Sequence, residues 1–399
     1  MPGLTVEGVY QHIHGVCFKT GPPGTVGAET EWFVRDDTDP EAHVPTGRLR
    51  TLLDVVGPPP NRSAITYEPG GQLELSSRPY PGLAELHAAL DADIRHVRDA
   101  IAPAGLSLAG HGVDPFRRPS FQAEHPRYRC MRSYYDTSGF PDSGLAMMCS
   151  TASVQVCLDI GADRADAGRR WRLVHALGPV LVAAFANSSL GAGRPTGHRS
   201  GRQAIWKALD PCRTLPVQAN GWDADPAEAW TRYALDARVM VVHRAGEWVA
   251  DPGMTFREWI AKGEPGTDDL DYHLSTLFPP VRPRGWLELR MIDALPVRYW
   301  AVPVAVATAL LDDPRASAAA EAACEPVTGR WAAAARHGLS DPALARAAAA
   351  CFDAALGALP RLGAPGLVPV VGEYAERYVG RGRCPADDSL SSTPEEYAR

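Results

Sequence analysis

Four segments of this chain alternate apolar side chains with carboxylate, amide or hydroxyl side chains, and no other feature of the sequence constrains the fold as strongly. They are GAETEWFV at 27–34, EPGGQLELSS at 68–77, TASVQVCLDI at 151–160 and WLELRMID at 286–293. Because successive side chains of a β-strand point to opposite faces, each segment predicts a strand with one apolar and one polar face. Side chains on the same face lie about 6.5 Å apart, so each polar pair can reach a common space.

The polar faces of these strands concentrate acidic side chains. They carry five glutamates: Glu29, Glu31, Glu68, Glu74 and Glu288. Taken singly, each strand is also compatible with a solvated face of an antiparallel sheet. A solvated face usually mixes lysine and threonine with glutamate, however, and the four strand cores contain no lysine. If the five carboxylates converge, their mutual repulsion raises their pKa values unless cations neutralise them.

Carboxylate oxygens are the ligands that hard cations prefer. An all-oxygen set suits Mg²⁺ or Mn²⁺ better than Zn²⁺, which favours histidine and cysteine. The chain has no Walker-type, dinucleotide, zinc-protease or nucleophile-elbow motif, and GAGRPTG at 191–197 has the wrong spacing for a phosphate loop. The residues alone therefore predict a sheet whose concave polar face holds two or more Mg²⁺ ions for phosphoryl chemistry.

The composition describes a globular protein with no evident nucleic-acid or membrane partner. Of 399 residues 45% are hydrophobic, and the formal net charge is −7. The apolar runs at 176–186 and 299–311 each contain a proline and are shorter than the roughly 20 residues of a membrane-spanning helix. No secretory signal is visible at the N-terminus. Eight cysteines without a C-x-x-C pair indicate free thiols in a reducing cytoplasm.

The chain shows no internal repeat and no central linker. We therefore expect one domain over residues 1–383, followed by a polar and flexible tail at 384–399. His12 and His14 stand on an alternating stretch that resembles a strand.

The remaining periodic segments predict helices that serve as scaffolding. Apolar residues at spacings of three and four indicate helices at 81–101 and 165–186. Two Ala-rich helices are expected at about 314–336 and 341–358, the second with Ser340 as its N-cap.

Five longer motifs follow one another in a distinctive order: GAETEWFV, ITYEPGGQLELSS, the run over 131–159, GRQAIWKALDPCRT and RGWLELRMIDALP. In this order and spacing they resemble the glutamate–cysteine ligases of the plant and bacterial second type. The motifs span about 27–296, some two-thirds of the chain, and EPGGQLELS and MMCSTASVQV are quite specific to that family. Within it, the chain is most similar to the actinobacterial branch that makes γ-glutamylcysteine for ergothioneine.

The resemblance implies an α+β fold of the glutamine-synthetase-like carboxylate–amine ligases. In that fold an antiparallel sheet curls into a funnel that binds ATP, Mg²⁺ and glutamate, with helices packed outside. The resemblance also implies six metal contacts, the first two on different Mg²⁺ ions: Glu29, Glu31, Glu68, Glu74, Gln155 and Glu288. Gln155 stands where a related branch of ligases has a histidine.

Arginines are expected to bind the anionic groups, because a guanidinium fork matches carboxylate and phosphate oxygens. The resemblance places Arg290 with Glu288 in the catalytic centre, Arg213 toward the ATP phosphates and Arg202 toward a substrate carboxylate. A surface salt bridge is the alternative for each arginine. Four further residues are expected to line the amino-acid pockets: Met131, Arg132, Tyr134 and Tyr135.

The implied reaction has two steps. The γ-carboxylate of glutamate attacks the γ-phosphorus of ATP, and the amine of cysteine then displaces phosphate from γ-glutamyl phosphate to form the amide. Three alternatives remain open at this stage: a ligase of the same fold that couples glutamate to another amine, a guanidino-type phosphotransferase, and a non-catalytic sensor that keeps the cleft. No pattern in the sequence predicts the oligomeric state.

Overall fold

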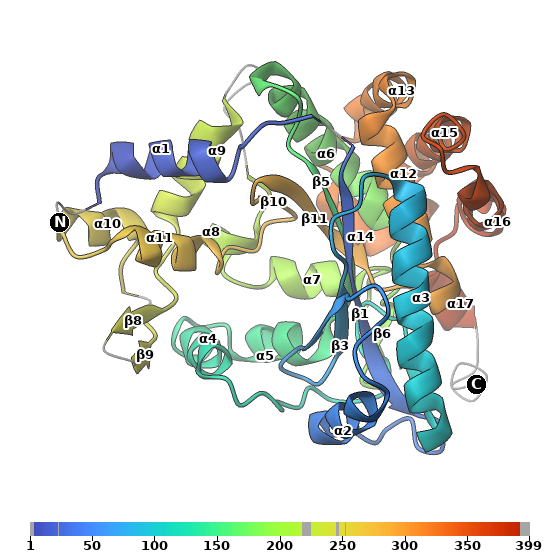
Figure 1. The fold of residues 1–399 in the computed structure, drawn as a ribbon, viewed down its shortest axis with the longest axis horizontal. Coiled ribbons are helices and arrows are strands. Elements are labelled where there is room, and N and C mark those ends of the chain that lie inside the picture. Colours follow the sequence, from blue (N-terminus) through green and yellow to red (C-terminus); the bar gives the residue numbers. More distant parts are fainter. Residues whose placement is uncertain (1–3, 23, 218–224, 245–246, 252, 392–399) are drawn as a thin grey trace.

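The computed structural model describes residues 4–22, 24–217, 225–244, 247–251 and 253–391, and its centre is one antiparallel sheet (Figure 1). Its strands lie in the order β10 (Val281–Pro283), β11 (Trp286–Asp293), β5 (Ser153–Asp159), β1 (Val26–Asp36), β3 (Leu73–Ser76) and β2 (Ala64–Tyr67), and β4 (Leu106–Ala109) also pairs with β1. The four predicted strand segments are therefore neighbours in one sheet, which confirms the α+β class.

The two faces of the sheet differ as the alternation predicts. Alternate side chains such as Leu73, Leu75 and Val156 are fully buried, and α3 (Leu83–Ile101), α6 (Arg164–Ala184) and α12 (Ala301–Asp312) pack against the strands. In Figure 1, α3 and most of the C-terminal helices lie on one side of the sheet. The opposite side faces α4 (Pro126–Thr137), α5 (Pro141–Ser150) and α7 (Gly201–Lys207). This second side carries the polar residues.

Strand register places the polar residues next to one another. Glu31 is the Cα partner of Glu74 across β1 and β3, and Glu29 is the partner of Gln155 across β1 and β5. The pairing of β11 with β5 shifts between Leu289 and Ile292. Such a bulge re-aims side chains, and Arg290, which lies within it, donates its backbone N–H to Pro280 of the neighbouring segment.

The turn between β2 and β3 depends on a glycine. A Cβ atom on Gly70 would lie 2.2 Å from the carbonyl oxygen of Cys149, at the end of α5. Only glycine permits this close approach of two backbones. The contact fixes the turn that carries Glu68 over the sheet.

The helices around this core include several differences from the sequence prediction. The expected helix at 314–336 is two helices, because Pro326 and Gly329 interrupt it. The N-cap of the following helix is Asp341, whose side chain accepts the N–H groups of Ala343 and Leu344, and the prediction of Ser340 was wrong. The remaining helices and two small hairpins are α1 (Val6–Val16), α2 (Thr46–Val56), α8 (Pro211–Thr214), α9 (Pro226–Asp236), α10 (Phe256–Ala261), α11 (Thr267–Leu274), α13 (Pro314–Cys324), α14 (Trp331–His337), α15 (Pro342–Ala358), α16 (Val368–Arg377), α17 (Ala386–Ser391), β6 (Leu190–Gly191) with β7 (Arg194–Pro195), and β8 (Val242–Arg244) with β9 (Glu247–Val249).

The first helix and the segment after residue 383 both differ from the sequence prediction. His12 and His14 lie on the helix α1, not on a strand. Cys384 and Ala386 are fully buried, and Ala386 begins α17, so the packed part of the chain continues past residue 383. Residues 392–399 of the expected tail lie outside the described residues. No helix of the described part is long and apolar enough to cross a membrane.

Candidate active site

A cavity of about 330 Å³ opens on the polar face of the sheet. Its floor carries four of the five predicted glutamates together with Gln155 and Arg290, and its walls come from α4, α5, α7 and the segment 275–284. Its lining residues are Glu29, Glu31, Glu68, Pro69, Gln72, Glu74, Arg127, Tyr128, Met131, Met147, Met148, Thr151, Gln155, Arg202, Trp206, Ser275, Phe278, Arg282, Arg284 and Arg290. Segments far apart in the chain thus build one acidic and arginine-rich cleft.

Negative charge on the glutamates of the floor is unfavourable, because the carboxylates are buried close to one another. Burial, with Glu288 and Glu74 nearby, raises the pKa of Glu29 to about 8. Burial and the charge of Glu74 also raise the pKa of Glu31 and, more strongly, that of Glu68. These carboxylates stay ionised at neutral pH only if positive charge joins them.

Glu31 is the best-supported carboxylate of the floor. Its Oε2 accepts the backbone N–H of Ser153 at 2.8 Å, and its Oε1 accepts the hydroxyl of Ser153 and the amide of Gln155 at 3.0 Å each. Gln155 in turn accepts a hydrogen bond from Nη1 of Arg290 at 2.5 Å. The amide thus links an acidic and a basic residue of the cleft and orients both.

Glu288 lies beneath this floor and does not line the cavity. Its Oε2 accepts hydrogen bonds from Arg282 at 2.6 Å and Arg290 at 3.0 Å. Burial alone would raise its pKa, but these two arginines outweigh burial and hold the pKa at about 2. Oε1 is buried without a hydrogen bond, and the guanidinium of Arg284 stands 3.5 Å away. An ionised Glu288 therefore holds two arginines against the floor and keeps one oxygen available.

Arg202 presents unused hydrogen-bond donors to the cavity. Its Nη2 donates to the carbonyl of Arg290 at 2.9 Å, whereas its Nε and Nη1 have no hydrogen-bond partner although the side chain is 3% exposed. Buried donors without partners are rare and costly. An anionic oxygen could satisfy either donor, but Nε and Nη1 point to different sides of the guanidinium, so one carboxylate cannot accept from both.

The chain also matches a known family. A family model described as "Glutamate-cysteine ligase family 2 (GCS2)" covers residues 25–398. The chain belongs to the glutamate–cysteine ligase family 2. Glutamate–cysteine ligase EgtA of Mycolicibacterium smegmatis is 40% identical over 390 residues, which are 96% of this chain and 90% of the relative. EgtA of Mycobacterium tuberculosis is 39% identical over 388 residues, 95% and 88% of the two chains.

Two further comparisons are more distant. The chloroplastic glutamate–cysteine ligase of Arabidopsis thaliana is 35% identical over 269 residues, which are 65% of this chain and 51% of the plant protein. A crystal structure of a glutamate–cysteine ligase from Francisella tularensis in complex with AMP has a TM-score of 0.57 at 11% identity and covers 96% of this chain and 88% of that chain. At that identity the likeness shows the fold alone.

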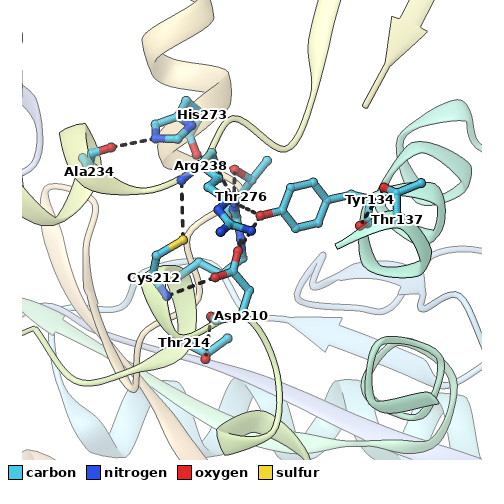
Figure 2. A network of polar contacts seen from close by, with 10 residues as sticks. Tyr134, Thr137, Asp210, Cys212, Thr214, Ala234, Arg238, His273 and Thr276 are labelled. Carbon is cyan, nitrogen blue, oxygen red and sulfur yellow. Dashed lines mark hydrogen bonds and ion pairs between the residues drawn. The ribbon is translucent and has the colours of Figure 1, made fainter. Parts of the chain in front are cut away.

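One residue that the family resemblance places at ATP has a different position. Arg213 is fully buried outside the cavity, between α4, α8 and the segment after α11. Its five N–H groups have five acceptors: Asp210 Oδ2, the carbonyl and hydroxyl of Thr276, the hydroxyl of Tyr134 and the carbonyl of Arg238. Figure 2 shows these partners converging on one buried centre. No donor is left for a phosphate, so the prediction for Arg213 is corrected to a structural role.

Three of the four expected pocket residues also lie elsewhere. Tyr134 is fully buried and donates its hydroxyl to Asp210 in the same network (Figure 2). Tyr135 is fully buried in the apolar cluster around α4 and α5. Arg132 pairs with Asp136 at 3.0 Å along α4. Tyr134 and Tyr135 follow Met131 by three and four residues and share its side of α4, but they lie one turn farther along the helix, beyond the cavity. Arg132 is rotated about 100° around the helix from Met131 and so points elsewhere.

Sequence reasoning missed two arginines that complete the basic side of the cleft. Arg282 and Arg284 precede the last acidic strand in VRPRGWLELR, and the register of β10 with β11 pairs Arg282 with Glu288. Because the two arginines are two residues apart in a strand-like run, the sequence could have predicted that both lie on the same face as Glu288. Arg127 of α4 was missed as well. It donates to the hydroxyl and the carbonyl of Ser275 and so joins two walls of the cavity.

The donor set fits magnesium. Four carboxylates share the floor, and the pKa values of Glu29, Glu31 and Glu68 are raised. Among the described residues no lysine lines the cavity, and Glu288 Oε1 lacks a hydrogen bond. Hard oxygen ligands of this kind favour Mg²⁺ over softer metals. The carboxylate oxygens of Glu29 and Glu288 lie within 4.8 Å of each other, close enough to share an ion.

Proposed function

We propose that this ligase couples the γ-carboxyl group of L-glutamate to the amine of L-cysteine at the expense of ATP, with γ-glutamyl phosphate as the intermediate. The products are γ-glutamylcysteine, ADP and phosphate, and γ-glutamylcysteine supplies ergothioneine biosynthesis. The observation that carries the proposal is one cavity lined by four glutamates and by five arginines, which are Arg127, Arg202, Arg282, Arg284 and Arg290. Similarity to the mycobacterial EgtA enzymes over nearly the whole chain supports the choice of cysteine as the acceptor.

We assign the metal-binding role to Glu29, Glu31, Glu68, Glu74 and Glu288. Gln155 is a weaker candidate, because its Oε1 already accepts a hydrogen bond from Arg290. Bound Mg²⁺ would supply charge neutralisation at the triphosphate. The acidic floor is otherwise too electronegative to accept a phosphate.

Arg290 is proposed to contact the phosphoryl group in transfer. The β-bulge aims its side chain into the cleft, and contacts with Glu288 and Gln155 fix the guanidinium in place. Fixed donors stabilise charge that develops in a transition state without a cost of reorganisation. One of the two unpaired donors of Arg202, Nε or Nη1, is proposed to bind a carboxylate oxygen of the amino-acid substrate.

The sheet is proposed to curve around these substrates as a funnel, with Met131 on the wall toward the acceptor amino acid. Eight free cysteines support a reducing, cytoplasmic location. Cysteine, the proposed acceptor, also stays reduced in that compartment.

A mass-spectrometric product assay tests the proposal. The protein is incubated with ATP, Mg²⁺, glutamate and a panel of amines that includes cysteine. Formation of γ-glutamylcysteine with equal amounts of ADP and phosphate is expected. A preferred product with another amine would redirect the acceptor assignment, a stable phosphorylated guanidine would indicate a phosphotransferase, and ATP binding without any product would indicate a sensor.

A further inference from the structure

A cysteine lies at one end of the carboxylate cluster, although a thiol is not a ligand that Mg²⁺ favours. Cys157 follows Gln155 by two residues on the same face of β5, and its Cα is paired with that of Glu288 on β11. The Sγ atom of Cys157 and carboxylate oxygens of Glu29 and Glu288 all lie within 4.8 Å of one another. A thiolate is a soft ligand that Mg²⁺ does not favour but Zn²⁺ and Cd²⁺ do.

The Glu288 carboxylate gives independent support for a cation at this point. The side chain is fully buried, and Arg282 and Arg290 occupy only its Oε2. Oε1 is buried without a hydrogen bond. The nearest cationic group, Nη1 of Arg284 at 3.5 Å, belongs to a side chain that is 47% exposed and is therefore free to move away. A buried carboxylate oxygen that lacks a hydrogen bond, and whose ion pair is with a half-exposed arginine, can accept a bound cation in place of that arginine.

The geometry needs little adjustment to hold a tetrahedral ion. Ligand atoms 2.0–2.3 Å from Zn²⁺ lie about 3.5 Å apart, and the three atoms are already within 4.8 Å of one another, so no separation has to shorten by more than roughly 1.3 Å. Gly27 is the Cα partner of Cys157 on β1, and a Cβ atom there would lie 3.4 Å from that of Cys157. Because position 27 has no side chain, the half-buried thiol has room to rotate toward the two carboxylates.

We propose that Glu29, Cys157 and Glu288 form a binding site for a thiophilic divalent cation of the Zn²⁺ class, with water as the fourth ligand. Two of these residues are also assigned to Mg²⁺, so the cation would displace Mg²⁺ from them and stop the reaction. This inhibitory consequence rests on the proposed function, whereas binding of the ion does not.

Binding is tested on the reduced protein with Cd²⁺ as the probe, because a Cd²⁺–thiolate bond gives an ultraviolet charge-transfer band. We expect the band to saturate at one equivalent in the wild type and to be lost in Cys157→Ser and Cys157→Ala. The matched control is Cys212→Ser, which removes another half-buried cysteine outside the cluster and should keep the band. A band of unchanged intensity in both Cys157 variants, or no band in the wild type, overturns the site.

Inhibition is tested with Zn²⁺ and with L-2-aminobutyrate as the acceptor, since this isostere of cysteine has no thiol to sequester the metal. Each variant is compared with its own rate at saturating Mg²⁺ without Zn²⁺. Half-inhibition should require at least tenfold more Zn²⁺ in Cys157→Ser than in the wild type and the Cys212→Ser control. If Cys157→Ser and the wild type are half-inhibited at the same Zn²⁺ concentration, the inhibitory role is overturned. If the Cd²⁺ band appears but no ligase activity exists with any acceptor, the proposed function fails while the metal site stands.

Discussion

Arg290 is the residue whose role can be separated most sharply into binding and catalysis. Lysine keeps its charge but not the planar fork that joins Gln155 and Glu288. We expect Arg290→Lys to lower kcat and kcat/KM together by a factor of about 10² to 10³, equivalent to roughly 3–4 kcal/mol of transition-state stabilisation. Steady-state kinetics with glutamate and ATP varied in turn measure the effect. A wild-type kcat with only a raised KM for glutamate would place Arg290 in ground-state recognition.

Glu29 tests the metal assignment at the same scale. Replacement by glutamine removes a charge but keeps the shape of the side chain, so Glu29→Gln should weaken Mn²⁺ binding and cut turnover by several orders of magnitude. Electron paramagnetic resonance of free Mn²⁺ measures the affinity without reference to activity. Glu85→Gln, an exposed change in the first turn of α3, is the control and should behave as the wild type. Unchanged Mn²⁺ affinity in Glu29→Gln would remove this residue from the metal site.

At the scale of secondary-structure elements, Arg213 joins α4, α8 and the segment after α11 into one wall of the cleft. Arg213→Gln leaves Asp210 buried without its cationic partner and should lower the free energy of unfolding by about 3–5 kcal/mol. Urea denaturation measures the loss. Arg95→Gln, which breaks an exposed pair with Asp91, should change stability by less than about 1 kcal/mol. An Arg213→Gln protein of wild-type stability with a raised KM for ATP would restore the phosphate-binding assignment.

The elements also show which parts of the site are readable in the sequence. The acidic strands were readable because alternation is local, and each strand needs only its own residues to define its polar face. The family resemblance added the metal and arginine roles, and the structure brings Glu29, Glu31, Glu68 and Glu74 into one cavity. The contrast between Arg202 and Arg213 was not readable. Both are buried arginines, and residues far along the chain, Thr276, Tyr134 and Arg238, accept four of the five N–H groups of Arg213, whereas two nitrogens of Arg202 keep free donors.

At the scale of the whole molecule, His273 couples folding to pH. Burial is the largest cause that holds its pKa at about 3, whereas an unfolded histidine titrates near 6.5. Between these values the unfolded chain binds a proton that the folded protein does not, so stability falls as the pH falls. We expect the wild type to lose about 2 kcal/mol more than His273→Gln between pH 7 and pH 5. Glu29, Glu31 and Glu68 have raised pKa values and act in the opposite direction, but they are common to both proteins and cancel in the difference.

Urea denaturation of both proteins at the two pH values measures this difference. In the fold, Nε2 of His273 is 2.8 Å from the carbonyl of Ala234, and its ring stacks on Phe256 (Figure 2 shows the first contact). Glutamine can replace the hydrogen bond but cannot titrate. Parallel pH profiles for the two proteins would mean that the histidine accepts a proton in the folded state.

The central claim is that the cleft activates the γ-carboxyl group of glutamate as an acyl phosphate, and oxygen transfer tests it most directly. Glutamate labelled with ¹⁸O in both γ-carboxylate oxygens is converted with unlabelled ATP and cysteine, and the released phosphate is examined by mass spectrometry. One carboxylate oxygen forms the bond to the γ-phosphorus, and the later cleavage of the acyl C–O bond leaves that oxygen on phosphate. The account predicts one ¹⁸O in each phosphate released and one retained in the amide. Phosphate without ¹⁸O, formed in step with γ-glutamylcysteine, would contradict it.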